Sequence, residues 1–323
     1  LYVNMDIIRD GVEHMNLKNK KLSSLIDEYY LSFDFKSLRE ETKVQYQYFL
    51  SVVLDTKVGD AQSLGSINFS DITTKMAKVA YEEWCERGIH LANHVMSVAR
   101  VVYNYGIHME HCTVNPFSSI KRRTPIARKV VWTQSDVKAY LDVAYSDFYT
   151  RSLGLIVQMA YEWCQRIGDM RLLQFTNIDF DKSVLNLQQS KRRSVVHLPI
   201  SLDLLEMLKQ QKEEYGFQSY VAPYPTAIRG SYEPYSLHRL SKVARRTMKL
   251  CGLPNELRIA DLRRTGTTEM VEAGVSMGQI MSVTGHANPN SVKPYMKNTY
   301  ASAENALTTR EKYVISTGYV PNN

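Results

Sequence analysis

The chain has 323 residues, which is long enough for two domains that each have a hydrophobic core. Hydrophobic residues make up 44% and charged residues 23% of the sequence, as is ordinary for a globular protein, and no stretch approaches the roughly 20 apolar residues of a membrane-spanning helix. The formal net charge of +7 permits a polyanionic partner without proving one, so the distribution of the charges matters more than their total.

The N-terminal segment, residues 1–20, is expected to be a tail without a signal peptide, because Asp6, Arg9 and Asp10 interrupt its first apolar stretch. The chain opens on Leu1 rather than on methionine, so we treat it as a fragment. The cysteines lie far apart and show no CxxC spacing, which predicts core thiols in a reducing compartment, the cytoplasm, rather than a zinc site or a disulfide framework. They are Cys85, Cys112, Cys164 and Cys251.

Residues 21–120 are predicted to form a compact bundle of about four helices. The stretches "LSSLIDEYYLSF" and "EETKVQYQYFLSVVL" carry apolar residues at helical spacing. The next helix, "DITTKMAKVAYEEWCERG", has a plausible cap at Asp71 and ends at Gly88. Another amphipathic run, "LANHVMSVARVVYNYGI", stops near Gly106.

A basic segment, "IKRRTPIARKVVWT", follows and contains the predicted linker 121–132. It has Pro125 in its middle, no negative charge and no helical periodicity, which is typical of a linker between two helical regions. Two interpretations stay open: a solvated hinge, or a hinge that lies along phosphates while two domains clamp a duplex. The positive charges are Lys121, Arg122, Arg123, Arg128 and Lys129.

The region 133–312 is predicted to combine helices with a small sheet. "TQSD" starts a helix with Thr133 as its cap, and "RSLGLIVQMAYEW" is typical of a buried helix. "SVLNLQQ" and "SVVHLPI" alternate like strands. "SMGQIMSVTG" is a short helix with a capping box from Ser276 to Gln279. The tight turn between the two strands contains Ser190, Lys191, Arg192 and Arg193.

A strongly amphipathic helix is predicted for residues 236–252, "SLHRLSKVARRTMKLCG", with Ser236 as its cap and Gly252 at its end. Its apolar stripe is expected to contain Leu237, Leu240, Val243 and Cys251. The opposite face is basic and contains Arg239, Lys242, Arg245, Arg246 and Lys249.

Four short segments could meet at one anion-binding site. "CQRIGDMRLL" carries Arg166 and, one turn later, Asp169, and the hairpin turn carries Lys191. "ADLRRTGTTEM" carries Arg263 just before a helix, and His286 follows a helix-ending glycine. Each segment alone is weak evidence, because an arginine at a helix end is usually a solvated cation. Their combination and order are much less expected by chance.

This order resembles the tyrosine recombinase (phage integrase) family. The family's catalytic domain carries an R-I-x-E/D segment, a lysine in a β-hairpin, an H-x-L-R box, a G-H step and a tyrosine nine residues after that histidine. The most specific stretch here is "DLRRTGTTEMVEAGVSMGQIMSVTGH". The matching segments are Arg166-Ile167-Gly168-Asp169, Lys191, Ala260-Asp261-Leu262-Arg263, Gly285-His286 and Tyr295.

Two positions bear most on the resemblance. The family's H-x-L-R histidine is Ala260 here, and His238 or a bound water is the first candidate to fill its role. Tyr295 lies at the family's spacing, whereas Tyr300 lies five residues further and would face elsewhere on a helix. Pro294 disfavours regular helix just before Tyr295. Because the chain has 21 tyrosines, the choice of Tyr295 rests on the motif.

The chemistry implied by the resemblance suits these residue types. A phosphodiester repels nucleophiles because its non-bridging oxygens are anionic, and two arginines can hold those oxygens without a metal or other cofactor. A tyrosine, with an ordinary pKa of about 10, needs a cationic pocket that favours its phenolate. The lysine can protonate the leaving sugar oxygen, and the histidine can hydrogen-bond a non-bridging oxygen. The implied catalytic residues are Tyr295, Arg166, Lys191, Arg263 and His286, with Asp169 orienting a neighbouring cation or backbone group.

The resemblance implies a mainly α fold with a small β-sheet. An N-terminal helical core-binding domain at 21–120 would precede an α+β catalytic domain at 133–312 and a C-terminal tail at 313–323. Residues 1–20 are too short for the arm-binding domain that related integrases often carry. The implied function is that of a site-specific recombinase or integrase, which cuts and rejoins DNA strands of a mobile genetic element or viral genome through a covalent 3′-phosphotyrosine.

The implied partner is double-stranded DNA with specific core sites, and no membrane. Four protomers would gather on two sites, with the C-terminal segment docked on a neighbouring protomer, and accessory DNA-bending proteins are a further implied class of partner. Besides the linker, the residues expected to contact DNA are Arg192, Arg193, Arg239, Lys242, Arg245 and Arg246.

Other functions stay open. A type IB topoisomerase uses similar residues, although the small helical domain and the G-H…Y box favour a recombinase. A DNA-binding member that has lost catalysis has Ala260 as its only direct support. A metal-dependent nuclease is less favoured, because the sequence lacks the clustered carboxylates that would hold Mg²⁺.

Overall fold

The chain divides into two compact units, residues 1–127 and 128–323, and the division falls inside the predicted linker. None of the helices in the described ranges is long and apolar enough to cross a membrane. Arg192, one of the predicted DNA contacts, lies outside the described residues. The computed structural model describes residues 21–59, 62–126, 128–191, 193–295 and 300–318.

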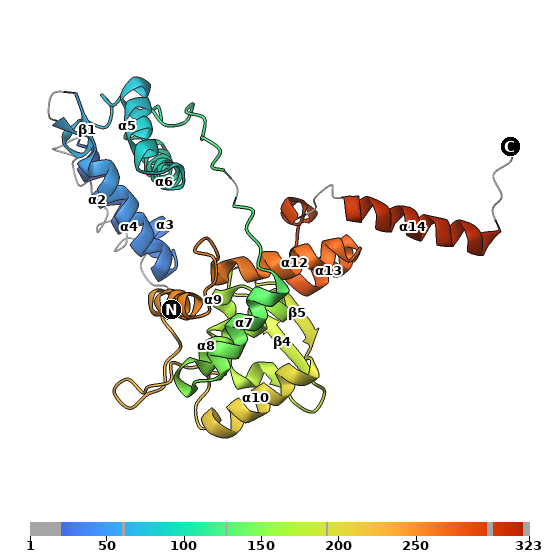
Figure 1. Cartoon of the computed structure of the whole chain (residues 1–323). Coiled ribbons are helices and arrows are strands. Elements are labelled where there is room, and N and C mark those ends of the chain that lie inside the picture. Colours follow the sequence, from blue (N-terminus) through green and yellow to red (C-terminus); the bar gives the residue numbers. More distant parts are fainter. Residues whose placement is uncertain (1–20, 60–61, 127, 192, 296–299, 319–323) are drawn as a thin grey trace, which may run out of the picture. The chain divides into compact units, whose positions relative to one another are not determined.

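The first unit is a helical bundle, drawn in blue to teal in Figure 1. A small antiparallel hairpin of β1 (Lys57–Val58) and β2 (Gln62–Ser63), which helical periodicity did not predict, leads into a 3-10 turn at Leu64–Ser66. The helices of this unit are α2 (Leu22–Leu31), α3 (Phe33–Lys36), α4 (Glu40–Asp55), α5 (Thr74–Arg87) and α6 (Ile89–His108).

The core of the first unit includes Trp84, whose side chain is fully buried. Its indole Nε1 donates a hydrogen bond to Thr56 Oγ1 (2.7 Å), and its ring stacks 6.0 Å from the ring of Phe117. The buried hydroxyl of Tyr103 donates to the carbonyl oxygen of Phe69 (3.1 Å). Both large polar aromatics therefore keep a hydrogen-bond partner in the apolar interior, where an unpaired donor would be costly.

Two helix ends in this unit differ from the predictions. The cap predicted at Asp71 is wrong, because α5 begins after Thr73, whose Oγ1 accepts a backbone hydrogen bond (3.2 Å). The helix predicted to stop near Gly106 continues to His108. A Cβ on Gly106 would lie 3.2 Å from the Sγ of Cys112, so this glycine permits close packing rather than ending the helix.

The first half of the basic linker is fastened to the first unit. The hydroxyl of Tyr81 accepts a hydrogen bond from the backbone N–H of Arg123 (2.7 Å), and the side-chain amide of Asn93 donates to the carbonyl of Arg123 (2.8 Å). The side chains of Lys121, Arg122 and Arg123 stay exposed. The backbone here is therefore held while its charges face solvent.

The second unit combines helices with a three-stranded antiparallel sheet in the order β3-β4-β5. Its strands are β3 (Ile178–Asp179), β4 (Val184–Gln188) and β5 (Val195–Pro199). Gln188 pairs with Val195, so the predicted hairpin is confirmed and its turn spans 189–194. The helices are α7 (Gln134–Tyr145), α8 (Phe148–Glu162), α9 (Ile167–Met170), α10 (Leu202–Tyr215), α11 (Leu237–Leu250), α12 (Leu262–Glu272), α13 (Met277–Thr284) and α14 (Tyr300–Thr317).

Helix α8 forms the centre of this unit, since residues 152–160 are buried without interruption. The buried helix predicted from "RSLGLIVQMAYEW" is thereby confirmed. The predicted caps at Thr133, Ser236 and Ser276 are also confirmed, because each side-chain oxygen accepts a backbone hydrogen bond at the start of its helix. The mainly α fold with a small β-sheet is confirmed as well.

The apolar stripe predicted for α11 is partly wrong. Leu240 is buried as expected, but Leu237 is 57% exposed. The buried side of the helix continues instead through Ala244 and Met248. The stripe follows the 3.6-residue period from Leu240, and Leu237 lies at the first turn, where the helix leaves the core.

Helix α14 runs across the boundary expected at 312/313. Near its start, the side-chain amide of Asn305 donates to the carbonyl of Glu272 at the end of α12 (3.0 Å). Further along, Leu307, Tyr313 and Ile315 are each at least 66% exposed. The helix therefore presents large apolar side chains to solvent.

Candidate active site

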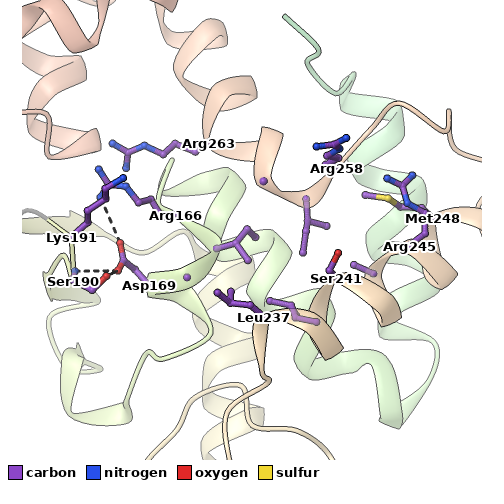
Figure 2. A pocket seen from close by; sticks show the side chains of 16 residues that line it. Arg166, Asp169, Ser190, Lys191, Leu237, Ser241, Arg245, Met248, Arg258 and Arg263 are labelled. Atoms are coloured by element: carbon purple, nitrogen blue, oxygen red, sulfur yellow. Dashed lines mark hydrogen bonds and ion pairs between the residues drawn. The ribbon is translucent and has the colours of Figure 1, made fainter. Parts of the chain in front are cut away.

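A pocket of about 620 Å³ lies in the second unit, and Figure 2 shows the side chains that line it. Three of the predicted catalytic residues, Arg166, Lys191 and Arg263, line this pocket together with Asp169. They come from three separate segments, which follow α8, connect β4 to β5 and begin α12. The remaining wall is formed by one side of α11 and by the turn at 258–260.

Arg166 lies just before the short helix α9, where the chain turns after α8. Its Nη1 donates a hydrogen bond to Gln189 Oε1 (2.8 Å) and lies 3.7 Å from Asp169 Oδ2. The carboxylate of Asp169 is 4% exposed, and its Oδ1 accepts hydrogen bonds from the backbone N–H (3.1 Å) and the hydroxyl (2.5 Å) of Ser190. Asp169 thus connects Arg166 to the turn that carries Lys191, as Figure 2 shows.

Lys191 is exposed on the hairpin turn and points its ammonium group toward the guanidinium groups of Arg166 and Arg263 in Figure 2. Arg193, further along the turn, adopts φ +53° and is exposed. Because Ser190 is held by Asp169, the backbone beside Lys191 is anchored while the lysine side chain reaches over the pocket. That arrangement suits a group that delivers a proton.

Arg263 is 8% exposed in the first turn of α12. Its Nη1 donates to the carbonyl oxygen of Cys164 (3.0 Å), and its Nη2 contacts His286 Nε2 (3.0 Å). Burial, and then the neighbouring charge of Arg166, lower the pKa of Arg263 to about 10. The guanidinium still carries its charge at neutral pH, so two adjacent cations face the pocket.

The contacts of His286 indicate which nitrogen of its imidazole ring carries the proton. Thr284 Oγ1 donates its single proton to the carbonyl oxygen of Ile280 (2.7 Å), so it accepts from His286 Nδ1–H, which lies 2.7 Å away. The other ring nitrogen, Nε2, then presents a lone pair to Arg263 Nη2. The turn that allows this begins at Gly285, whose φ of +69° lies in the left-handed region that favours glycine.

Tyr295 lies beside these residues at the end of a 3-10 turn, Lys293–Tyr295. Its ring centroid is 6.0 Å from that of His286, and the Cζ of Arg264 lies 5.2 Å from the Tyr295 ring centroid. Tyr295 is one of the neighbours that raise the pKa of Arg263, against the larger effect of burial. Tyr300 begins α14, and its side chain lies outside the described residues.

Ala260 is exposed and lines the pocket from the 3-10 turn Ile259–Asp261. The adjacent Asp261 is buried and accepts hydrogen bonds from Arg128 Nε (3.1 Å) and Nη2 (2.7 Å). His238, the predicted substitute, is exposed on α11 and is not among the described residues that line the pocket. At the position of the family's histidine this chain therefore has only a methyl group, which leaves open space in the pocket that the arginines line.

Arg128, a predicted DNA contact, is paired with Asp261, and this hydrogen-bonded carboxylate raises the pKa of Arg128. Arg239 lies 4.4 Å from the ring centroid of Tyr224, and Arg245 donates to the carbonyl of Asn255 (2.9 Å) while lining the pocket. The exposed members of the predicted set are Lys121, Arg122, Arg123, Lys129, Arg193, Arg239, Lys242 and Arg246.

Sequence reasoning missed two buried amides, Gln165 and Gln189, and the hydroxyl of Thr284. Gln189 contacts Arg166, and Thr284 contacts His286. Gln165 and Gln189 are both fully buried. The available signal was position alone: Gln165 precedes Arg166, and Gln189 lies two residues before Lys191.

Comparison with known proteins identifies relatives of this chain and of its fold. A tyrosine recombinase of Pseudothermotoga lettingae is 19% identical over 149 residues, which are 44% of this chain and 48% of the relative, so the match spans about half the length of that recombinase. A lambda integrase dimer bound to a COC′ core site is 20% identical, with a TM-score of 0.71 over 87% of this chain and 96% of the lambda chain.

The Tn1549 transposon integrase in complex with a circular intermediate DNA is 15% identical, with a TM-score of 0.71 over 90% of this chain and 99% of the other. At these identities the likeness shows the fold. The model of the phage integrase family matches residues 130–302, which is more than half of the sequence and includes every segment that forms the site. The chain therefore belongs to the phage integrase family.

Proposed function

We propose that this protein is a site-specific DNA recombinase that cuts and rejoins DNA strands through a covalent 3′-phosphotyrosine at Tyr295. The observation that carries the proposal is the convergence of Arg166, Lys191 and Arg263 on one pocket, with His286 bound to Arg263 and Tyr295 beside His286. A phosphodiester in this pocket would meet two guanidinium groups and an ammonium group.

Each group has a role that its environment supports. The guanidinium groups of Arg166 and Arg263 hold the non-bridging oxygens and stabilise the charge of the pentacoordinate transition state. Tyr295 gives its proton to solvent and its oxygen attacks phosphorus, the bond to the 5′ sugar oxygen breaks, and Lys191 gives that oxygen a proton. The reverse sequence, with the 5′ hydroxyl of another strand as nucleophile, rejoins the DNA. Asp169 supports both Arg166 and the turn of Lys191.

We also propose that several copies of the protein assemble on DNA. Exchange between two duplexes needs four cleavages, so four protomers should gather on two double-stranded core sites, with accessory DNA-bending proteins as further partners. A lambda integrase tetramer bound to a Holliday junction has the same fold, with 19% identity, a TM-score of 0.70 and coverage of 92% of this chain. We expect the exposed apolar side chains of α14, including Leu307 and Ile315, to dock on a neighbouring protomer.

Deletion of residues 313–323 tests this assembly. The deletion removes Tyr313 and Ile315 but none of the residues around the pocket. Binding to a single half-site should be unchanged, whereas the tetramer on two sites should be lost in sedimentation. Tetramers of unchanged abundance would show that the segment after residue 312 is not the connecting element.

A catalytically weakened DNA-binding member is the second candidate, because Ala260 leaves one expected functional group missing from the pocket. The deciding experiment is incubation with a suicide duplex that contains the core site, read as a protein–DNA adduct on a denaturing gel. Tyr295→Phe should abolish the adduct while duplex binding stays nearly intact, since no charge is removed. Tyr300→Phe is the matched control, and an adduct lost only in that variant would move the nucleophile to Tyr300.

The wild-type protein separates the remaining alternatives. An intact active site predicts a covalent adduct, whereas a purely DNA-binding member would bind the duplex and form none. Relaxation of supercoiled DNA by a monomer, without two specific sites, would favour a type IB topoisomerase over a recombinase.

A further inference from the structure

Gln189, the first residue after strand β4, is a fully buried amide that touches three parts of the active site. Its Oε1 accepts a hydrogen bond from Arg166 Nη1 (2.8 Å). Its Nε2 donates to Gln165 Oε1 (2.6 Å) and to the carbonyl oxygen of Thr284 (2.8 Å). One side chain therefore connects the arginine turn, the hairpin that carries Lys191 and the end of α13 just before His286.

The partners of Gln189 are themselves fixed. Gln165 is fully buried, and its Nε2 donates to the carbonyl oxygens of Trp163 (2.8 Å) and Val283 (2.7 Å). With both donors committed, its Oε1 faces Gln189 as an acceptor. The two amides thus form a short chain of hydrogen bonds in a dry interior, where each unmade bond would be costly.

These contacts allow only one orientation of the Gln189 amide. If its oxygen and nitrogen exchanged places, an N–H group would face the guanidinium of Arg166, and an oxygen would face two acceptors, Gln165 Oε1 and the Thr284 carbonyl. All three hydrogen bonds would be lost. The surrounding atoms therefore present a fixed acceptor to Arg166 Nη1.

Gly285 shows how closely the amide is enclosed. A Cβ at this position would lie 2.6 Å from Gln189 Nε2, and the residue has φ +69°. Glycine before His286 is thus required twice, for the left-handed turn that ends α13 and for the space that Gln189 occupies. The turn at Gly285-His286 and the side-chain amide of Gln189 therefore pack directly against each other.

We propose that Gln189 is a positioning residue for the recombination chemistry: it fixes the guanidinium of Arg166 for the scissile phosphate and keeps the Lys191 hairpin in register with the Gly285-His286 turn. This inference rests on the proposed function. Arg166 is partly exposed at the pocket and has Asp169 as a second partner, so its other N–H groups are available for phosphate oxygens. Without the acceptor on Gln189, the guanidinium would sample other rotamers.

The test compares Gln189→Met, which keeps the length of the side chain and removes the amide, with Gln211→Met. Gln211 is also buried in the second unit, where its amide donates to Ser152 Oγ (3.1 Å), and it does not line the pocket. Gln189→Met should slow single-turnover cleavage of the suicide duplex by roughly 10- to 100-fold, as expected for a misplaced catalytic group. Duplex affinity should change by less than about threefold, and Gln211→Met should cleave like the wild type.

A neutral substrate separates positioning of Arg166 from a general loss of structure. A methylphosphonate at the scissile position lacks one anionic oxygen, so it depends less on the arginine charge. The deficit of Gln189→Met should therefore shrink on this substrate, in parallel with the deficit of Arg166→Gln. Equal deficits on phosphate and methylphosphonate would overturn the proposal.

Sulfate binding gives a measurement that does not depend on cleavage. Sulfate should raise the unfolding temperature of the wild type and of Gln211→Met, and it should raise that of Gln189→Met and Arg166→Gln markedly less. A full sulfate shift in Gln189→Met would refute the positioning role even if the wild type formed no adduct. Failure of the adduct with the expected sulfate pattern would instead refute the proposed recombinase function and leave Gln189 as an organiser of an anion site.

Discussion

The second unit holds two groups of cations in different ways. Around the pocket, Arg166 and Arg263 each have a polar partner, and Arg263 is 8% exposed. On the basic face of α11, Lys242 and Arg246 are exposed to solvent. Charges in a buried setting act strongly on a bound phosphate, whereas solvated charges act weakly and are screened by salt. The contrast suggests that the pocket provides the chemistry and the exposed faces provide affinity.

The largest expected effect comes from replacing a buried arginine of the pocket. Arg263→Gln should lower the single-turnover cleavage rate by at least about 10²- to 10³-fold, since it removes a donor aimed at the transition-state charge. Arg246→Gln, the exposed counterpart, should change the rate at saturating duplex by less than about twofold, because a solvated charge adds little to chemistry. Similar losses in the two variants would contradict the division between chemistry and affinity.

The same substitution has a consequence for stability. The pKa of Arg263 is lowered from its ordinary value to about 10, so the folded protein binds this proton less tightly than the unfolded chain. The buried charge therefore destabilises the fold below about pH 10, and the penalty falls as the pH rises from 10 toward the ordinary pKa of arginine in the unfolded chain. At pH 7, Arg263→Gln removes this penalty along with its hydrogen bonds, so the unfolding temperature should change by less than about 4 °C.

A smaller effect is expected from filling the open position beside the arginines. Ala260→His should raise the single-turnover cleavage rate by roughly 100-fold, the lower end of the range for one general acid–base group, since the other donors remain. The neighbouring Asp261 already holds the turn through Arg128, so the backbone should accept the new side chain. Ala260→Gln is the control for a polar group that cannot transfer a proton.

If Ala260→His cleaves no faster than the wild type while duplex binding is normal, another group already fills the role. His238 is poorly placed for this role, because it is exposed on α11 and is not among the described residues that line the pocket. An ordered water beside Ala260 would then be the explanation to pursue.

Local patterns predicted much of the fold and part of the site. The largely apolar sequence of α8, the alternating strands β4 and β5, and the caps at Thr133 and Ser276 depend on neighbouring residues, so sequence could reveal them. The motif order also predicted that Arg166, Lys191 and Arg263 would meet, and they line one pocket. Their catalytic roles stay predictions.

The missed features depend on contacts between distant segments. Gln189 is bonded to Gln165 and Thr284, which lie 24 and 95 residues away, and nothing in the sequence separates a buried amide from a solvated one. Likewise, Arg128 looked like the other basic residues of the linker until its pairing with Asp261, 133 residues away, became visible. Charge pattern shows where cations are concentrated, but only the fold shows which of them already have a partner.

Substitutions in the linker should have the smallest effect on the cleavage rate. They also test most sharply the contrast between cations that have a partner and cations that are solvated. Arg122, Arg123 and Lys129 are exposed, whereas Arg128 is held by Asp261. Changing the three exposed residues together to glutamine should lower the slope of log K against log salt by up to about 2.7, because each phosphate contact contributes about 0.9. Cleavage at saturating duplex should stay unchanged.

Adding Arg128→Gln to this triple variant should not flatten the slope further. It should lower the unfolding temperature, because the buried Asp261 loses its ion-pair partner. A further drop in slope on adding Arg128→Gln would mean that DNA draws Arg128 away from Asp261, and an unchanged slope in the triple variant would reduce the linker to a plain hinge.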